Sequence, residues 1–343
     1  MLQRCSAGWI MCGTARTIRP RSAVLAARWP GVPNVGDITA VTARARVSLA
    51  GWADLPRVDV VCAGYPCQGE SDAGLRGGED DPRFRWPDVR AAVRALRPGL
   101  VVLENVRGHL GRSFPRVVAD LSTDGYVCRW CCVRAADVGA PHRRERLFAV
   151  AWPEEEEPAW LPGTDAVGLA DNLTVLPTPV SSLGRTAGAS SVAATLDRIR
   201  AGHTFGLDDA ITLLPTPLAT DGAKGGPNQR GSSGDFALPA AVQPGRWGAY
   251  APAIARWERV IGRSAPDPTI MGRNRGQLSP MFVEWMMGLS GGHVTDAVSQ
   301  RSDALRVLGN GVVPQAAALA LRVLLTEPAV LDYVQPDLFD MSH

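Results

Sequence analysis

Short apolar runs alternate with a segment of helical periodicity in the first half of the chain. Residues 58–63, 100–103 and 147–152 are apolar runs bounded by turn-forming residues, which predicts three buried β-strands. Between the first two runs, apolar side chains recur at the spacing of one helix face over residues 89–96, and Pro98 follows as a helix stop. This alternation predicts an α/β sheet with crossover helices.

The pattern changes after residue 152. Four glutamates between two prolines occupy residues 153–158, and the sequence that follows is rich in Gly, Pro, Ser and Thr with weak periodicity. The tetrapeptide Leu-Pro-Thr-Pro stands at 176–179 and again at 214–217, which indicates two related turns. Helical periodicity returns at 280–289 and at 315–325.

This change of pattern predicts a chain that leaves the sheet domain, forms an excursion and returns. The predicted parts are a catalytic domain at 1–153, a loop-rich domain at 154–275, a return segment at 276–330 that completes the catalytic domain, and a tail at 331–343.

Composition narrows the class of protein only modestly. Apolar residues make up 45% of the 343 residues, and the formal net charge is +2. We predict no membrane segment, because the apolar runs are shorter than the roughly 20 residues that a membrane helix needs. Seven scattered cysteines indicate free thiols in a reducing compartment, so a cytoplasmic protein is expected.

The candidate nucleophile is Cys67, in the segment Gly64-Tyr65-Pro66-Cys67-Gln68 that directly follows the first predicted strand. Proline stiffens this loop, and glycine allows another group to approach the backbone closely. Cysteine is an effective covalent catalyst even when only a small fraction is thiolate. Alone, a Pro-Cys pair at a strand end is more often a buried structural thiol, so Cys67 depends on the segments that follow.

Glu104 is the candidate acid, in Leu103-Glu104-Asn105-Val106 at the end of the second predicted strand. The ends of adjacent parallel strands meet at one crevice, so we expect Glu104 to lie opposite Cys67. A carboxyl group there can stabilise or protonate a substrate ring nitrogen. Asn105 is expected to brace the turn. The alternative for Glu104 alone is an acid at a helix N-terminus.

A basic segment, Arg143-Arg144-Glu145-Arg146, precedes the third predicted strand. Alternate residues of an extended chain project to the same side, which predicts that Arg144 and Arg146 point together toward the crevice. The alternative for such a tetrad in isolation is a solvated charge run.

In this order and at these separations, the three segments resemble the cytosine-specific DNA methyltransferases that methylate carbon 5 of the base, of the Dcm-like bacterial or phage type. The resemblance covers about residues 28–152 and 278–325. It implies a doubly wound, Rossmann-like α/β fold that uses S-adenosylmethionine, with the excursion as a smaller target-recognition domain. It also implies Cys67, Glu104, Arg144 and Arg146 as the catalytic set, with the arginines holding the flipped base, its phosphate or Glu104.

The same resemblance implies two further sets of residues. The cofactor-binding set is Asp37, Gly64, Pro66, Asn310 and Val312. The DNA-binding set is Gln68, Ser71, Arg230, Arg273 and Arg275. Near the end, Gly309-Asn310-Gly311-Val312-Val313-Pro314 is similar to the last motif of the family, with Gly311 where serine is usual.

The opening of the chain departs from the family. The family begins with a strand and a glycine-rich cofactor turn, and nothing here matches that turn. Residues 1–36 contain no acidic residue, although the family places one there to hold the cofactor ribose. We therefore expect a truncated or degenerate N-terminus.

The implied partner is double-stranded DNA, methylated by a monomer for restriction–modification or phage self-protection, with a cognate restriction endonuclease acting separately. The alternative is a catalytically impaired remnant that only binds DNA. A cysteine hydrolase would need a histidine such as His109 or His142 to activate Cys67, and no pattern pairs them. We predict no metal site, because Cys128, Cys131 and Cys132 lack the fourth ligand that structural zinc requires.

Overall fold

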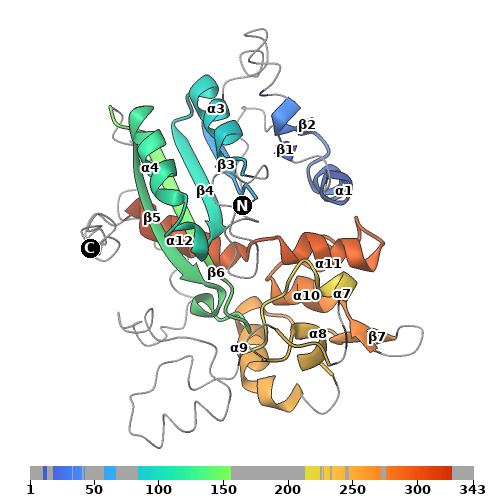
Figure 1. Ribbon diagram of the computed structural model, residues 1–343. Helices are drawn as coiled ribbons and strands as arrows, with labels where there is room; N and C mark the ends of the chain where they lie inside the picture. Colours follow the sequence, from blue (N-terminus) through green and yellow to red (C-terminus); the bar gives the residue numbers. More distant parts are fainter. Residues whose placement is uncertain are drawn as a thin grey trace, which may run out of the picture. The chain divides into compact units, whose positions relative to one another are not determined.

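The computed structural model places the chain in two compact units (Figure 1). The first, the sheet unit, comprises Met1–Val133, Glu145–Asp165 and Ala317–His343, and the second, the helical unit, comprises Arg134–Arg144 and Ala166–Ala316. The predicted return segment 276–330 is thus divided at Ala317, and the three-part division stays a prediction. The structure describes residues 11–13, 18–32, 34–40, 42, 58–66, 84–155, 213–224, 226, 228–231, 234–243, 247–271 and 276–326.

The sheet unit contains a four-stranded sheet in the order β3-β4-β6-β5. Its strands are β3 (Val60–Ala63), β4 (Leu100–Val106), β5 (Tyr126–Arg134) and β6 (Glu145–Pro153). β3 and β4 are parallel, with Ala63 opposite Leu103, whereas β6 is antiparallel to β4. The three predicted strands are confirmed. However, β4 runs past Leu103, so that Glu104 and Asn105 lie within the strand rather than after it.

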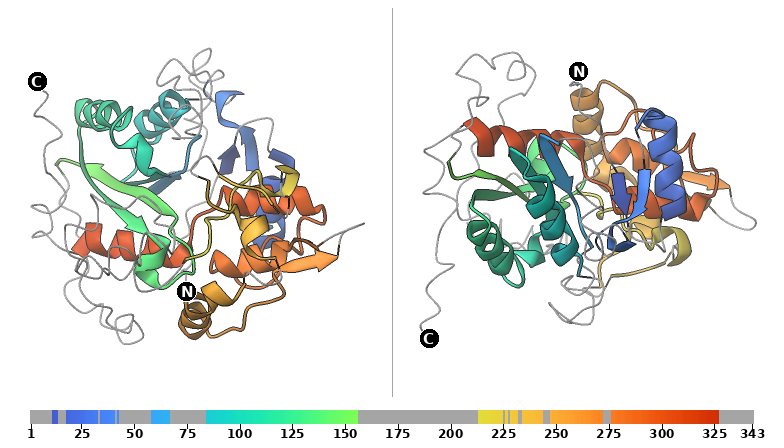
Figure 2. Two further views of the ribbon diagram at one scale, coloured as in Figure 1. Left: turned by 60° about the horizontal axis from the view of Figure 1, so that its bottom comes forward. Right: turned by 90° about the horizontal axis from the view of Figure 1, so that it is seen from above.

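Helices cover both faces of this sheet. α3 (Trp86–Leu96) and α4 (Phe114–Thr123) lie on one face, and α12 (Pro314–Thr326) lies on the other (Figure 2). The first two helices bury apolar faces against the strands, which forms a core that removes most of their apolar surface from water. The residues of this core include Trp86, Val89, Val93, Val101, Leu103, Phe114, Val117, Leu121, Tyr126 and Leu147.

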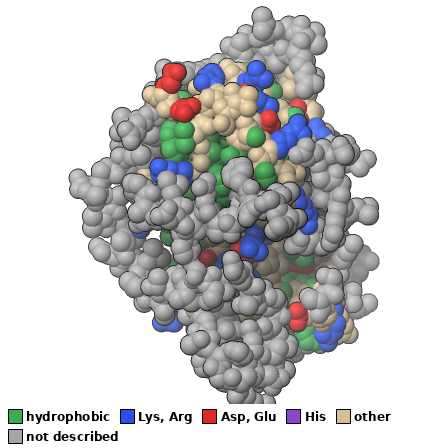
Figure 3. Space-filling model, turned by 60° about the vertical axis from the view of Figure 1, so that its left-hand side comes forward, with side chains coloured by type: hydrophobic (Ala, Val, Ile, Leu, Met, Phe, Trp, Pro, Cys, Tyr) green, Lys and Arg blue, Asp and Glu red, His purple; other side chains and the backbone are tan. Residues whose placement is uncertain are grey.

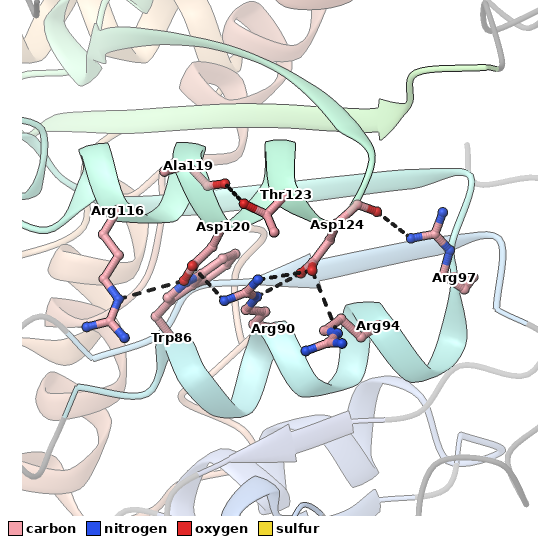
Figure 4. Close-up of polar contacts among 9 residues, drawn as sticks. All are labelled: Trp86, Arg90, Arg94, Arg97, Arg116, Ala119, Asp120, Thr123 and Asp124. Carbon is pink, nitrogen blue, oxygen red and sulfur yellow. Dashed lines mark hydrogen bonds and ion pairs between the residues drawn. The ribbon is translucent and has the colours of Figure 1, made fainter.

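A network of ion pairs ties α3 to α4 (Figure 4). The Arg90 guanidinium binds Asp120 at 2.6 Å and Asp124 at 2.7 Å. The Trp86 indole donates to Asp120 at 2.8 Å, and Arg97 donates to the Asp124 carbonyl. These arginines are therefore engaged with carboxylates and carbonyls of their own unit. On the face drawn in Figure 3, the described basic and acidic side chains are interspersed with apolar ones.

A small parallel β-α-β element begins the described chain. β1 (Met11–Gly13) pairs with β2 (Asn34–Asp37), and α1 (Ile18–Arg28) connects them. The sequence did not predict β1, because three residues are too few for an apolar alternation to stand out. Asp37 consequently lies at the carboxyl end of β2, where acids that bind nucleosides stand in doubly wound folds.

The helical unit consists of short helices around a second core. The longest helix among its described residues, α9 (Ala251–Ile261), ends at Gly262, whose φ of 65° suits glycine at a helix C-terminus. Buried Trp257, Phe282, Trp285, Met286 and Leu305 fill this core. The other elements are α7 (Asp221–Lys224), α8 (Leu238–Ala241), η7 (Trp247–Tyr250), β7 (Thr269–Met271), β8 (Gly276–Leu278), α10 (Pro280–Met286) and α11 (Arg301–Gly309).

One stretch of the described chain, Arg301–Leu325, is long and apolar enough by composition to cross a membrane. It consists of α11 and α12, which are separated between Gly309 and Pro314. The longer of the two has 13 residues, and at 1.5 Å per residue it spans about 20 Å, less than the roughly 30 Å of a bilayer core. Neither helix alone is long enough to span.

Candidate active site

The carboxyl ends of β3 and β4 bring Gly64 and Glu104 together. The parallel register of these strands places the residue after Ala63 beside the residue after Leu103. A Cβ atom added at Gly64 would lie only 3.1 Å from Glu104 Oε2, a tight approach that leaves no room for a larger side chain without movement. Glu104 thus lies beside the end of β3, although within β4 rather than after it, and its position opposite Cys67 stays a prediction.

Arg146 holds the Glu104 carboxylate. Its Nε lies 3.1 Å from Glu104 Oε1, and the two side chains are 18% and 26% exposed. The contact is a diagonal one across the β4–β6 pair, in which Val106 is opposite Arg146 and Glu104 is opposite Phe148. Of the three partners considered for the arginines, the structure shows Glu104 for Arg146. A guanidinium beside a carboxyl group fixes its orientation.

A second ion pair flanks the first. Arg107, directly after β4, binds Glu145 at 3.1 Å, and Glu145 is the first residue of β6. The sequence did not single out this pair, which joins the strand carrying Glu104 to the strand carrying Arg146.

Tyr65, which precedes the Pro66-Cys67 pair by one residue, is anchored from inside the protein. Its hydroxyl lies 2.7 Å from His109 Nε2, and both side chains are buried. The Asn105 side-chain amide donates to the Tyr65 carbonyl at 3.4 Å, while Asn105 Oδ1 accepts from the Val106 amide at 2.9 Å. Asn105 therefore braces the segment after β3 from within β4, rather than a turn of its own.

An aromatic cluster surrounds the Tyr65 ring. Phe84, Trp86 and His109 pack against it with ring centroids 5.5–6.4 Å apart. Sequence reasoning missed this anchor, because Tyr65 and His109 are 44 residues apart and no spacing rule links them. The signal that could have identified it is the large aromatic residue between Gly64 and Pro66, in a segment that otherwise favours a tight turn.

Several predicted site residues lie outside the described residues. They are Cys67, Gln68, Ser71, Arg273 and Arg275. The structure ends its description of this loop at Pro66, which is half-buried, and resumes at Phe84. Their roles stay predictions.

Arg144 differs from its predicted placement. β6 begins at Glu145, and Arg144 has a φ of 26°, so the alternation of an extended strand does not extend to it. Its side chain is buried, and its guanidinium donates to the carbonyls of Pro217 and Gly309 at 3.2 and 3.1 Å and to that of Gly311. The prediction that Arg144 projects alongside Arg146 as a strand neighbour is therefore wrong.

Among the predicted cofactor-binding residues, the structure describes three in the sheet unit: Gly64, Pro66 and Asp37. Asp37 lies at the end of β2. Its Oδ1 accepts hydrogen bonds from the Thr39 amide at 2.9 Å and from the Thr39 hydroxyl at 2.8 Å, which fixes the carboxylate at the end of β2. β1 and β2 pair in a two-stranded sheet of their own, separate from the four-stranded sheet that contains Glu104. A carboxylate at a strand end is a residue type that can bind a nucleoside, and the cofactor role of Asp37 stays a prediction.

Asn310 and Val312 belong to the turn between α11 and α12. Asn310 is exposed, and its amide donates back to the Arg306 carbonyl at 3.0 Å. A Cβ at Gly311 would lie 3.2 Å from the Leu308 carbonyl oxygen, so this turn is tight where the family usually has serine. Their cofactor role stays a prediction.

Arg230 is exposed in a short turn of the helical unit. Its guanidinium stacks 4.2 Å from the Phe236 ring centroid and donates to the Gly234 carbonyl at 2.5 Å. The guanidinium is thus oriented by its own turn, and its predicted contact with DNA stays a prediction.

The thiols of β5 are poor nucleophiles. Burial raises the pKa of Cys128, Cys131 and Cys132 to about 12 each. All three are free thiols, and among the described residues no group of three or more Cys, His, Asp or Glu side chains is arranged to hold a metal ion.

The α/β sheet, with Glu104 in β4 bound by Arg146 of the antiparallel β6, has the architecture of a Rossmann-like methyltransferase fold. The crystal structure of the S. pombe Dnmt2 methyltransferase superposes with a TM-score of 0.50 at 11% identity, covering 92% of this chain and 90% of that one. At this identity the likeness concerns the fold alone.

Comparison with sequence families is more specific. Residues 7–176 match the family model of the C-5 cytosine-specific DNA methylases, so this part of the chain belongs to that family. The type II methyltransferase M.AplI of Arthrospira platensis is 34% identical over 128 residues, which are 35% of this chain and 37% of that protein. The type II methyltransferase M.NlaIV of Neisseria lactamica is 31% identical over 150 residues, 40% of this chain and 33% of that protein. The matched segments thus span about a third of these relatives.

Proposed function

We propose that this protein is a DNA cytosine carbon-5 methyltransferase. It transfers a methyl group from S-adenosylmethionine to a cytosine flipped out of a specific duplex sequence. The observation that carries the proposal is the Glu104 carboxylate, held by Arg146 at 3.1 Å and lying against Gly64 at the strand end that leads to Cys67. The family to which residues 7–176 belong supports the same reaction.

The reaction begins with covalent activation of the base. Carbon 5 of cytosine is a weak nucleophile, so the Cys67 thiolate adds to carbon 6 and forms a carbon–sulfur bond. The electron pair displaced from the 5,6 double bond makes carbon 5 nucleophilic. A duplex hides this carbon, which is why the base must leave the stack at a cost of a few kcal/mol.

Glu104 neutralises the charge that develops on the ring. Its protonated carboxyl group donates to ring nitrogen 3, while its other oxygen accepts from the exocyclic amine, and this stabilises the added electron density. Arg146 keeps this carboxyl group in one orientation, since a guanidinium fork restrains a carboxylate better than a single point charge. Gly64 has no side chain, so the Glu104 carboxyl group has room to lie against it.

The cofactor supplies the methyl group that carbon 5 takes up. Asp37, at the end of β2, would hold its adenosine. Gly64 and Pro66 of the sheet unit and Asn310 and Val312 of the helical unit are the other proposed cofactor contacts. Loss of the carbon-5 proton then re-forms the 5,6 double bond and expels the Cys67 thiolate. The donor would be left as S-adenosylhomocysteine, the carbon-5 proton would pass to water, and ring nitrogen 3 would return its proton to Glu104.

The partner is double-stranded DNA, and Gln68, Ser71, Arg230, Arg273 and Arg275 are the proposed contacts. The setting is restriction–modification or phage self-protection, with any cognate nuclease acting separately. A cytoplasmic monomer fits this role. The alternative is a remnant that binds DNA without transferring methyl groups.

The test is transfer of a labelled methyl group to duplex DNA, followed by mass analysis of the nucleosides and bisulfite sequencing. We expect 5-methylcytosine at one sequence. Cys67→Ser should abolish transfer, whereas Cys62→Ser, an exposed thiol on the preceding strand, should leave it intact. Methylation of adenine would refute the proposal, and DNA binding without any transfer by the unaltered chain would favour the remnant.

A further inference from the structure

Arg144 is the meeting point of three segments that are far apart in the sequence. Its side chain is only 4% exposed. The guanidinium donates to the carbonyls of Pro217, Gly309 and Gly311, and the backbone amide donates to Thr216 Oγ1 at 3.2 Å. The contacts join the segment 141–144 to the second Leu-Pro-Thr-Pro tetrapeptide and to the turn that carries Asn310.

Backbone contacts bring the same segments together. The Leu214 amide donates to the Pro141 carbonyl at 2.8 Å, and Leu214 forms a parallel bridge with His142. A Cβ at Gly309 would lie 2.2 Å from the Ala219 nitrogen, so these two backbones touch where only glycine fits. The excursion segment 214–219 and the turn 309–313 are therefore in direct contact.

The chemistry of arginine makes this junction specific. A guanidinium offers five donors in a rigid plane and can bind several carbonyls at once, which an ammonium on a flexible stem cannot reproduce. Arg144 also keeps a φ of 26°, a backbone conformation that is unfavourable for a residue with a side chain. Such a conformation persists only where the surrounding contacts determine it.

We propose that Arg144 is a positioning residue that couples the excursion segment 214–219 to the turn 309–313, so that DNA binding and cofactor binding influence each other. The inference rests on the proposed function, which assigns the excursion to DNA and Asn310 and Val312 to the cofactor. Coupling of two binding equilibria is reciprocal, so each ligand changes the affinity of the other by the same factor.

The first test measures the affinity for S-adenosylhomocysteine by calorimetry, with and without duplex DNA. The unaltered chain should show a change in affinity within the usual range of about 5- to 150-fold. Arg144→Lys should bring that ratio to within about twofold of one. Arg256→Lys is the matched control, because Arg256 is also buried and also donates to two carbonyls, those of Gly139 and Ala140. Equal loss in both variants, or an unchanged ratio in Arg144→Lys, would overturn the coupling.

The second test does not depend on methylation. Thr216→Val removes the acceptor of the Arg144 amide on the excursion side, and amide hydrogen exchange then reports on the turn. We expect faster exchange at Gly311, whose amide donates to the Leu308 carbonyl at 3.0 Å, and no change in α9. Unchanged exchange at residues 310–313 would reject the junction even if the protein methylates DNA. Conversely, faster exchange in a chain that transfers no methyl group would reject the proposed function and leave the junction standing.

Discussion

Glu104 Oε2 lies 3.1 Å from the position that a Cβ atom on Gly64 would occupy. The proposed acid thus rests against the backbone of the strand end that leads to the proposed nucleophile. The parallel register of β3 and β4 enforces this contact, and Arg146 restrains the carboxylate from the other side.

Gly64→Ala should therefore impair catalysis more than stability. The new methyl group must displace Glu104 by a few tenths of an ångström, and a displacement of that size should reduce methyl transfer about 10-fold. Gly99→Ala is the matched control, because a Cβ there would make an ordinary 3.7 Å contact with the Asp59 carbonyl. Transfer rates and thermal unfolding of both variants decide the point, and equal rates would show that Glu104 is not the acid.

Loss of the Glu104–Arg146 ion pair should lower methyl transfer far more than it lowers stability. Glu104→Gln should lower methyl transfer by at least about 100-fold, within the range of general acid–base catalysis. Because both side chains keep some exposure, the unfolding free energy should change by less than about 1 kcal/mol. Arg146→Lys in each background completes a double-mutant cycle. If the two substitutions act independently on the rate, the pair does not function as a unit.

The hydroxyl of Tyr65 should matter for the loop that carries Cys67. Tyr65→Phe removes the hydrogen bond to His109 and should cost about 1 kcal/mol of stability, together with a loss of activity. Tyr126→Phe is the control, because its buried hydroxyl donates to the Pro98 carbonyl at 2.9 Å elsewhere in the same unit. Similar losses of stability are expected, with impaired transfer in Tyr65→Phe alone. Impaired transfer in both variants would argue against a specific anchor.

The sequence predicted the sheet and its acid better than the junction around Arg144. Apolar runs and strand-end motifs follow local rules, so β3, β4 and β6 could be anticipated, with Glu104 as one of three partners considered for Arg146. The direction of Arg144 could not, because side-chain alternation presumes an extended backbone and the strand begins one residue later. Its partners at 217, 309 and 311 are set by tertiary packing, which leaves no trace in local periodicity.

The order of alkylation should distinguish the proposed nucleophile, Cys67, from the buried cysteines of β5. At pH 8, Cys128, Cys131 and Cys132 should resist iodoacetamide, since burial raises the pKa of each to about 12 and leaves little thiolate. Cys67 should be alkylated first, and mass analysis of the labelled peptides measures the order. Preferential labelling on β5 would remove the basis for assigning the reaction to Cys67.

Asp221 should give the helical unit a measurable pH dependence. Its side chain is 2% exposed; Oδ2 accepts from the Leu218 amide at 2.8 Å, while Oδ1 has no hydrogen-bond partner. Burial raises its pKa from 3.8 to about 6, although the Leu218 amide opposes the shift. The folded chain therefore binds this proton more tightly than the unfolded chain.

The sign follows from that difference. Stability associated with the Asp221 proton is fully present below about pH 4 and is lost as the pH rises toward 6, with a total of about 3 kcal/mol. Asp221→Asn should thus unfold at higher urea than the unaltered chain at pH 8, and this advantage should shrink at pH 5. Urea unfolding of both chains at these two pH values provides the comparison. A difference in unfolding free energy that is the same at both would mean that Asp221 does not titrate in this range.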